Sequence, residues 1–138
     1  MANKKRIMIV DDDKDVLTSI RQILEASGYK VYSFDNGRDC LKKLKEGKKP
    51  TLMVLDIMMP EMSGWEIQRR LKENPQWSRI PIIFLTGRDN ETAVDMYKRY
   101  GIDWIKKPFD INELKSCIER ILEYIGRYPK SRIKRCYC

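Results

Sequence analysis

A short apolar segment that runs directly into an acid limits the fold of this chain more than any other feature. Thr51–Leu55 lead into Asp56, and Pro60 and Gly64 then break the backbone. An apolar run of this length between breakers is typical of a strand buried on both faces. Such strands occur mainly in parallel sheets that are covered by helices on both sides. Asp56 is therefore expected at the carboxyl edge of the sheet, where open parallel sheets bind ligands.

Strand-like and helix-like segments alternate along the chain. Besides the central strand, the expected strands are Ile7–Val10, Val31–Phe34, Ile80–Leu85 and Ile102–Ile105. The expected helices carry the apolar stripes of Val16–Leu24, Cys40–Leu44, Ser63–Glu73, Asn90–Tyr97 and Asp110–Ile125. This alternation predicts an α/β fold, a doubly wound five-stranded parallel sheet that is flanked by five helices and joined by right-handed crossovers.

The length and composition fit one domain with a substantial core. The chain has 138 residues, and 42% of them are hydrophobic. No apolar run reaches the length of a membrane span. Ile7–Val10, which follow a basic N-terminus, are too few for the core of a signal peptide. We therefore expect a cytoplasmic protein that has no membrane partner.

The C-terminal residues differ from the rest of the chain in their charge. Residues 127–138 contain five basic side chains and no acid, while the whole chain has a net charge of +8. Because helical periodicity is lost from Gly126 onward, we predict a folded domain over residues 1–126 and a mobile basic tail over 127–138. The twelve tail residues are too few for a helix-turn-helix domain, so nucleic acid is not an expected partner.

Polar residues follow four of the five expected strands. Asp11 and Asp12 follow the first strand, Asp56 the third, Thr86 the fourth and Lys107 the fifth. The carboxyl ends of parallel strands meet at one edge, so these side chains are expected to converge. Asp11 and Asp12 can both reach the site only if regular strand geometry ends there, since neighbouring strand residues point to opposite faces.

Converging carboxylates need a proton or a cation. Two of them about 4 Å apart repel by roughly 4 kcal/mol at an effective dielectric constant of about 20. Magnesium fits this site because it binds one or two carboxylates together with phosphate oxygens. With Lys107 as a further positive charge and the Thr86 hydroxyl as a donor, Asp56 becomes a candidate nucleophile for acyl phosphate formation.

Four motifs together resemble the response-regulator receiver domain of two-component signalling. Val10-Asp11-Asp12 resembles the acidic pair of that family, and Leu55–Pro60 with Gly64 resembles its phosphoacceptor loop. Leu85-Thr86-Gly87 resembles the switch hydroxyl motif, and Lys107-Pro108-Phe109 the lysine-proline motif. The resemblance covers residues from about 5 to 125 and is specific as a set.

The resemblance implies a phosphorylation-dependent signalling switch rather than an enzyme. Asp56 would accept phosphate from a sensor histidine kinase or phosphotransfer protein, and a surface for a still unknown downstream protein would then change. Asp11, Asp12, Asp56 and the backbone carbonyl of Met58 would hold Mg²⁺, or Mn²⁺ in its place. Thr86 and Lys107 would contact the phosphoryl group.

The family also implies a flavodoxin-like strand order of 2-1-3-4-5, a cis Lys107-Pro108 bond, and a monomer or weak dimer. The switch residues would be Thr86 and the aromatic residue three before the lysine. That residue is usually Tyr or Phe in the family and is Trp104 here. A packing role and a moving role are both open for Trp104.

Two other functions are alternatives at this point. One is an aspartyl-phosphate phosphatase or phosphotransferase with Asp11 as the nucleophile. Its usual D-x-D-x-[TV] signature fails at Asp15, and it leaves Asp56 without a role. The other is an interaction module that ignores phosphate, against which the complete set of polar strand ends argues.

Overall fold

A five-stranded parallel sheet forms the centre of the protein, as the sequence predicts. The computed structural model describes residues 4–87 and 103–127. The strands are β1 (Arg6–Val10), β2 (Lys30–Phe34), β3 (Leu52–Asp56), β4 (Ile82–Thr86) and β5 (Asp103–Lys106). Their order is β2-β1-β3-β4-β5, and all neighbouring pairs are parallel. The predicted strand order is therefore confirmed.

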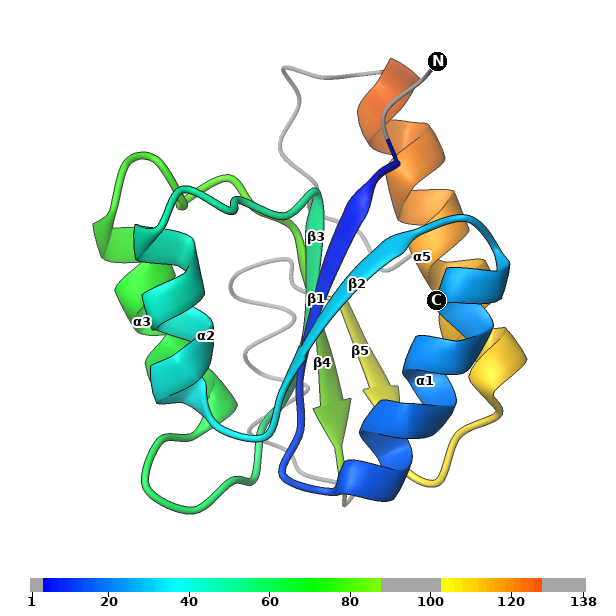
Figure 1. Ribbon diagram of the computed structural model, residues 1–138, viewed down its shortest axis with the longest axis horizontal. Coiled ribbons are helices and arrows are strands. Elements are labelled where there is room, and N and C mark those ends of the chain that lie inside the picture. Colours follow the sequence, from blue (N-terminus) through cyan, green and yellow to red (C-terminus); the bar gives the residue numbers. More distant parts are fainter. Residues whose placement is uncertain (1–3, 88–102, 128–138) are drawn as a thin grey trace.

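Helices cover both faces of this sheet. They are α1 (Lys14–Ala26), α2 (Gly37–Lys45), α3 (Gly64–Glu73) and α5 (Ile111–Arg127). In Figure 1, α2 and α3 lie on one side of the sheet, and α1 and α5 lie on the other. The fourth of the five predicted helices lies outside the described residues. Among the helices that are described, none is both long and apolar enough to cross a membrane.

Two predicted boundaries are wrong by two residues. β4 begins at Ile82 rather than Ile80, since Pro81 has no N–H to donate and contributes only its carbonyl oxygen, 2.9 Å from the Met53 nitrogen. Helix α5 continues through Gly126 and Arg127. The sequence instead predicts that helical periodicity ends before Gly126 and that the tail begins at Arg127. An ion pair of 2.9 Å between Glu123 and Arg127 spans the last turn of this helix.

The strand side chains form two cores, one on each face of the sheet. Ile7, Ile9, Leu52 and Val54 belong to the core that contains residues of α1 and α5. Met8, Val10, Met53 and Leu55 belong to the core that contains residues of α2 and α3. This alternation is the two-residue period of a strand, and it fixes the face on which each following polar residue emerges.

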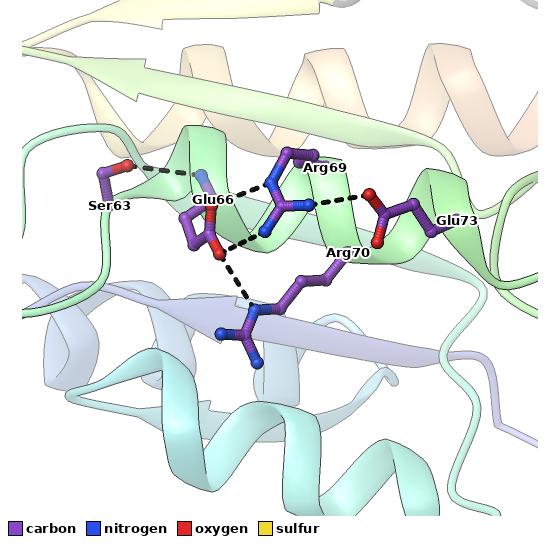
Figure 2. A network of polar contacts seen from close by, with 5 residues as sticks. All are labelled: Ser63, Glu66, Arg69, Arg70 and Glu73. Carbon is purple, nitrogen blue, oxygen red and sulfur yellow. Dashed lines mark hydrogen bonds and ion pairs between the residues drawn. The ribbon is translucent and has the colours of Figure 1, made fainter.

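The sequence Ser63-Gly64-Trp65-Glu66 predicts a capping box at the start of α3, and only the serine half of it forms in the structure. The Ser63 hydroxyl accepts a hydrogen bond of 3.2 Å from the backbone N–H of Glu66. The Glu66 carboxylate, however, accepts hydrogen bonds from Arg69 and Arg70, as Figure 2 shows. The helix thus begins with a serine cap, and the glutamate belongs to a surface ion-pair network.

We expect Ser63→Ala to lower the free energy of unfolding by about 1 kcal/mol, the usual cost of removing a serine N-cap. Chemical denaturation monitored by circular dichroism measures this change. Ser116→Ala, within α5, is the matched control and is expected to cost nothing, because alanine has the higher helix propensity. Equal effects of the two substitutions would contradict a capping role for Ser63.

Candidate functional site

Two buried carboxylates continue side-chain rows of the core between the sheet and α1 and α5. Asp11 stands two residues after Ile9, and Asp56 two residues after Val54. Both carboxylate-bearing residues are almost fully buried, with 0% of Asp11 and 4% of Asp56 exposed. Their position at adjacent strand ends follows from the parallel pairing of β1 with β3.

Asp12 joins these two residues to form a cluster of three carboxylates. β1 ends at Val10, so Asp12 is free of the alternation that would point it to the opposite face. One carboxylate oxygen each from Asp11, Asp12 and Asp56 lies within 4.8 Å of the other two. The structure therefore brings the three acids together, and we refer to them as the carboxylate cluster.

Lys107 places its ammonium group against the carboxylate cluster. The Nζ atom lies 2.5 Å from Oδ2 of Asp11 and 3.5 Å from Oδ2 of Asp56. The backbone N–H of Lys107 donates to the carbonyl of Thr86 at 2.6 Å, which ties this residue to the end of β4. The Lys107-Pro108 peptide bond is cis, as the family resemblance implies.

The surroundings of Asp56 oppose its ionisation. Burial, followed by the charge of Asp11, raises the pKa of Asp56 from 3.8 to about 7, although Lys107 and the Met58 N–H favour the charged form. Burial alone would lower the pKa of Lys107, but its hydrogen bond to Asp11 and the two carboxylate charges raise it. Lys107 is thus positively charged, and Asp56 titrates near neutral pH.

The other predicted residues differ in how they are placed relative to the carboxylate cluster, and Met58 contacts it directly. The backbone N–H of Met58 donates to Oδ1 of Asp56 at 3.3 Å, while its side chain is 70% exposed. Thr86 is buried at the end of β4, in the strand row of Ile82 and Phe84. Trp104 pairs in register with Phe84 and packs against the core on the α2 and α3 face. This packing contact is observed, and a moving role for Trp104 stays a prediction.

Comparison with known proteins identifies the family. The family model described as the response regulator receiver domain matches residues 7–119. This chain belongs to that family. Receiver domains are signalling modules rather than conventional enzymes, and they act as phosphorylation-dependent switches that histidine kinases phosphorylate.

Known relatives of this receiver domain include proteins of different overall length. It is 36% identical over 119 residues to the alkaline phosphatase synthesis transcriptional regulatory protein PhoP of Bacillus subtilis, a match that covers 86% of this chain and 48% of PhoP. It is 34% identical to protein PilH of Pseudomonas aeruginosa, over 85% of this chain and 97% of PilH. The chain thus spans about half the length of PhoP and nearly all of PilH.

A solved structure supports the same assignment. The CheY-like response regulator receiver domain protein from Methanospirillum hungatei is 34% identical to this chain. The match covers 94% of this chain and 100% of that protein, with a TM-score of 0.73.

Gly64 is a residue of the receiver site whose role the sequence did not reveal. The sequence motif assigns Gly64 to the turn after the central strand and to the phosphoacceptor loop, but it does not predict a contact with the backbone of Asp56. A Cβ atom at this position would lie 2.5 Å from the backbone oxygen of Asp56 and 3.0 Å from Cα of Ile57. The Gly64 N–H also donates to the Ile57 carbonyl at 3.0 Å. The glycine therefore lets α3 begin in direct contact with the backbone of Asp56, and its position directly after the Ser63 cap is the feature of the sequence that points to it.

The donor set of the carboxylate cluster suits a divalent cation of the kind that receivers bind. All of its side-chain ligand atoms are carboxylate oxygens, which hard cations prefer. Asp12 is exposed while Asp11 and Asp56 are buried, so the cluster opens to solvent on one side. This combination of buried and accessible oxygens can hold a metal ion that keeps part of its water shell.

Proposed function

We propose that Asp56 is the phosphoacceptor of this receiver domain. The observation that carries the proposal is the position of its carboxylate, buried at the end of the central strand, beside two further carboxylates and 3.5 Å from the Lys107 ammonium. An anion that is held next to a fixed cation can receive a dianionic group that it would otherwise repel. Thr86 and Lys107 are the side chains that contact the phosphoryl group in this proposal.

The transfer is a displacement at phosphorus. A carboxylate oxygen of Asp56 attacks the phosphorus of a phosphohistidine in line with the P–N bond. The P–O bond forms as the P–N bond breaks, and the bonding electron pair stays on the imidazole nitrogen. Because the attacking oxygen must be ionised, a pKa of about 7 keeps a large share of Asp56 reactive at neutral pH.

Asp11, Asp12 and Asp56, together with the Met58 carbonyl, are the proposed ligands of Mg²⁺, or of Mn²⁺ in its place. When bound, the cation offsets the charge between the carboxylates and the incoming phosphoryl oxygens. Lys107 provides the remaining positive charge from the end of β5. The proposed switch residues are Thr86, which would donate to a phosphoryl oxygen, and Trp104, which lies one strand further along the sheet.

The proposed phosphoryl donor is a sensor histidine kinase or a phosphotransfer protein, and a downstream protein is expected to recognise the changed surface. A cytoplasmic location follows from such a donor, and we propose a monomer or weak dimer. The family assignment supports the type of donor, while the identity of both partners belongs to the proposal.

Phosphorylation by a small donor tests the assignment of Asp56. With radiolabelled phosphoramidate and Mg²⁺, we expect stoichiometric, hydroxylamine-labile label, since an acyl phosphate is the product. Asp56→Asn is expected to abolish the label, as is removal of the metal with EDTA. Asp35→Asn is the matched control, because Asp35 follows β2 at the same edge of the sheet but lies outside the carboxylate cluster.

Two results would favour the alternative functions. Continuous turnover with label on Asp11 would indicate an aspartyl-phosphate phosphatase or phosphotransferase. Partner binding that stays the same in Asp56→Asn and in the phosphorylated wild type would indicate a phosphate-independent interaction module.

A further inference from the structure

A cationic groove lies between α2 and α3, on the face of the sheet opposite α1 and α5. It has a volume of about 340 Å³, and no residue of the carboxylate cluster contributes to it. The residues that line it are Arg38, Leu41, Lys42, Lys45, Met62 and Arg70. We call this feature the α2–α3 groove. Four of its six lining residues are basic, and none is acidic or aromatic.

The three positive charges that α2 contributes to the groove have no ion-pair partner in the part of the chain that the structure describes. Arg38, Lys42 and Lys45 are exposed and follow one another at intervals of four and three residues, on one face of the helix. Within residues 4–87 and 103–127, no acidic side chain forms an ion pair with any of the three. Like charges at this spacing repel each other and destabilise an isolated helix. An anionic partner would relieve this repulsion.

Arg70 completes the groove from the side of α3 and is held in place by Glu66. Its Nε atom donates to Oε1 of Glu66 at 3.1 Å, and its terminal nitrogens point away from that carboxylate (Figure 2). Hydrogen bonds from Arg69 and then Arg70 lower the pKa of Glu66 to about 2, so the anchoring carboxylate stays ionised. The guanidinium therefore presents its terminal donors in a fixed orientation, which suits a carboxylate or phosphate.

The floor of the groove distinguishes between anionic partners. It consists of Leu41, which is 6% exposed, and the partly buried Met62. A flexible, polarisable methionine is typical of surfaces that adapt to a protein partner. Single-stranded nucleic acids are bound through phosphate contacts and aromatic stacking, and the groove has no aromatic lining residue. An apolar floor between cationic walls favours an amphipathic protein segment.

We infer that the α2–α3 groove binds an acidic amphipathic helix of a partner protein. Carboxylates four residues apart on such a helix are separated by about 6 Å along its axis, the same rise that separates Arg38 from Lys42 on α2. The apolar residues between those carboxylates would cover Leu41 and Met62. Because this groove lies outside the carboxylate cluster, binding there does not require phosphorylation of Asp56.

Fluorescence anisotropy with the full-length chain tests this inference. The probe is a fluorescein-labelled helical peptide with Glu at positions i and i+4 and Leu on the same face. We expect saturable binding that Lys42→Glu combined with Lys45→Glu weakens at least about tenfold, since two surface ion pairs become two repulsive pairs. Arg70→Lys, which keeps the charge but removes the guanidinium fork, is expected to weaken binding several-fold.

The matched control is Lys48→Glu combined with Lys49→Glu, which changes the net charge equally at two exposed positions outside the groove. It is expected to leave peptide affinity within about twofold, because exposed charges at a distance are largely screened by salt. Circular dichroism confirms that all variants fold. The same peptide with Gln in place of Glu should bind at least about tenfold more weakly.

Three results would overturn the inference: no saturable binding by the wild type, equal loss in both double variants, or tighter binding of an oligonucleotide of equal charge. Asp56→Asn is expected to bind the peptide as the wild type does. Failure of this groove to bind therefore leaves the phosphoacceptor proposal untouched, and loss of label in Asp56→Asn leaves the groove proposal untouched.

Discussion

Gly64→Ala is expected to lower the free energy of unfolding by about 3 kcal/mol, at the upper end of what an inserted methyl group costs. The new Cβ would lie 2.5 Å from the carbonyl oxygen of Asp56 and 3.0 Å from both the Asp56 carbonyl carbon and Cα of Ile57. All three contacts are with main-chain atoms, which cannot move away by changing a rotamer. Either α3 shifts away from the sheet or the end of β3 moves.

The same substitution should also slow phosphorylation, because the backbone that it displaces belongs to Asp56. Chemical denaturation gives the stability change, and the phosphoramidate reaction gives the rate. Gly126→Ala is the control, since a Cβ there meets nothing within 4 Å. This residue lies within α5, where alanine should stabilise the protein by about 0.5 kcal/mol through its helix propensity. A stability change below about 0.5 kcal/mol in Gly64→Ala would show that the backbone relaxes without cost, contrary to the close contacts.

The parts of this protein that could be predicted from its sequence depend on periodicity. The apolar runs before Asp11 and Asp56 locate both residues at strand ends, and the parallel fold places strand ends at one edge. The two-residue period of the strands then explains why both emerge on one face. The convergence of the carboxylates follows from these local patterns and needs no knowledge of distant contacts.

The features that could not be predicted depend on distances between elements. The sequence indicates that Lys107 joins the site, but the close contact with Asp11 rather than Asp56 depends on the path of the chain after β5. Likewise, the Ser63 and Glu66 pattern predicts a full capping box, yet Arg69 and Arg70 compete for the glutamate. The contact of Gly64 with Asp56 and the α2–α3 groove arise only when separate elements pack together.

In metal-free solution at about pH 8, Asp56→Asn is expected to raise the free energy of unfolding by on the order of 3 kcal/mol, because solvent screening on the open side of the cluster reduces the roughly 4 kcal/mol that the pKa difference alone would give. The pKa of Asp56 is raised from 3.8 to about 7 in the folded protein by burial and the charge of Asp11. An ionised Asp56 therefore lowers the free energy of unfolding, and the neutral amide of asparagine avoids this loss. The variant that loses the phosphoacceptor should be the more stable protein.

The sign of the shift defines the pH window of this effect. A folded pKa above the unfolded one means that Asp56 contributes most stability below pH 3.8 and loses it as pH rises through about 7. Asparagine does not titrate. The difference in free energy of unfolding between Asp56→Asn and the wild type should therefore grow between about pH 4 and pH 7 and stay constant above that range. Thermal or chemical denaturation in EDTA at several pH values measures this difference. Asp35→Asn is again the control and should show no such growth.

Mg²⁺ should reverse the order of stability of the two proteins. A ligand that binds only the folded state stabilises it by about 4.1 kcal/mol at 1,000 times its dissociation constant, which exceeds the stability difference expected between the two metal-free proteins. The wild type should gain this stabilisation from Mg²⁺ at about pH 8. Asp56→Asn should gain much less, because the variant lacks one of the proposed anionic ligands. Apparent Mg²⁺ affinity of the wild type should fall about tenfold from pH 8 to pH 6, since the proton competes with the metal for Asp56. If the affinity were independent of pH in this range, the metal would bind without Asp56, and Asp11 with Asp12 would have to hold it alone.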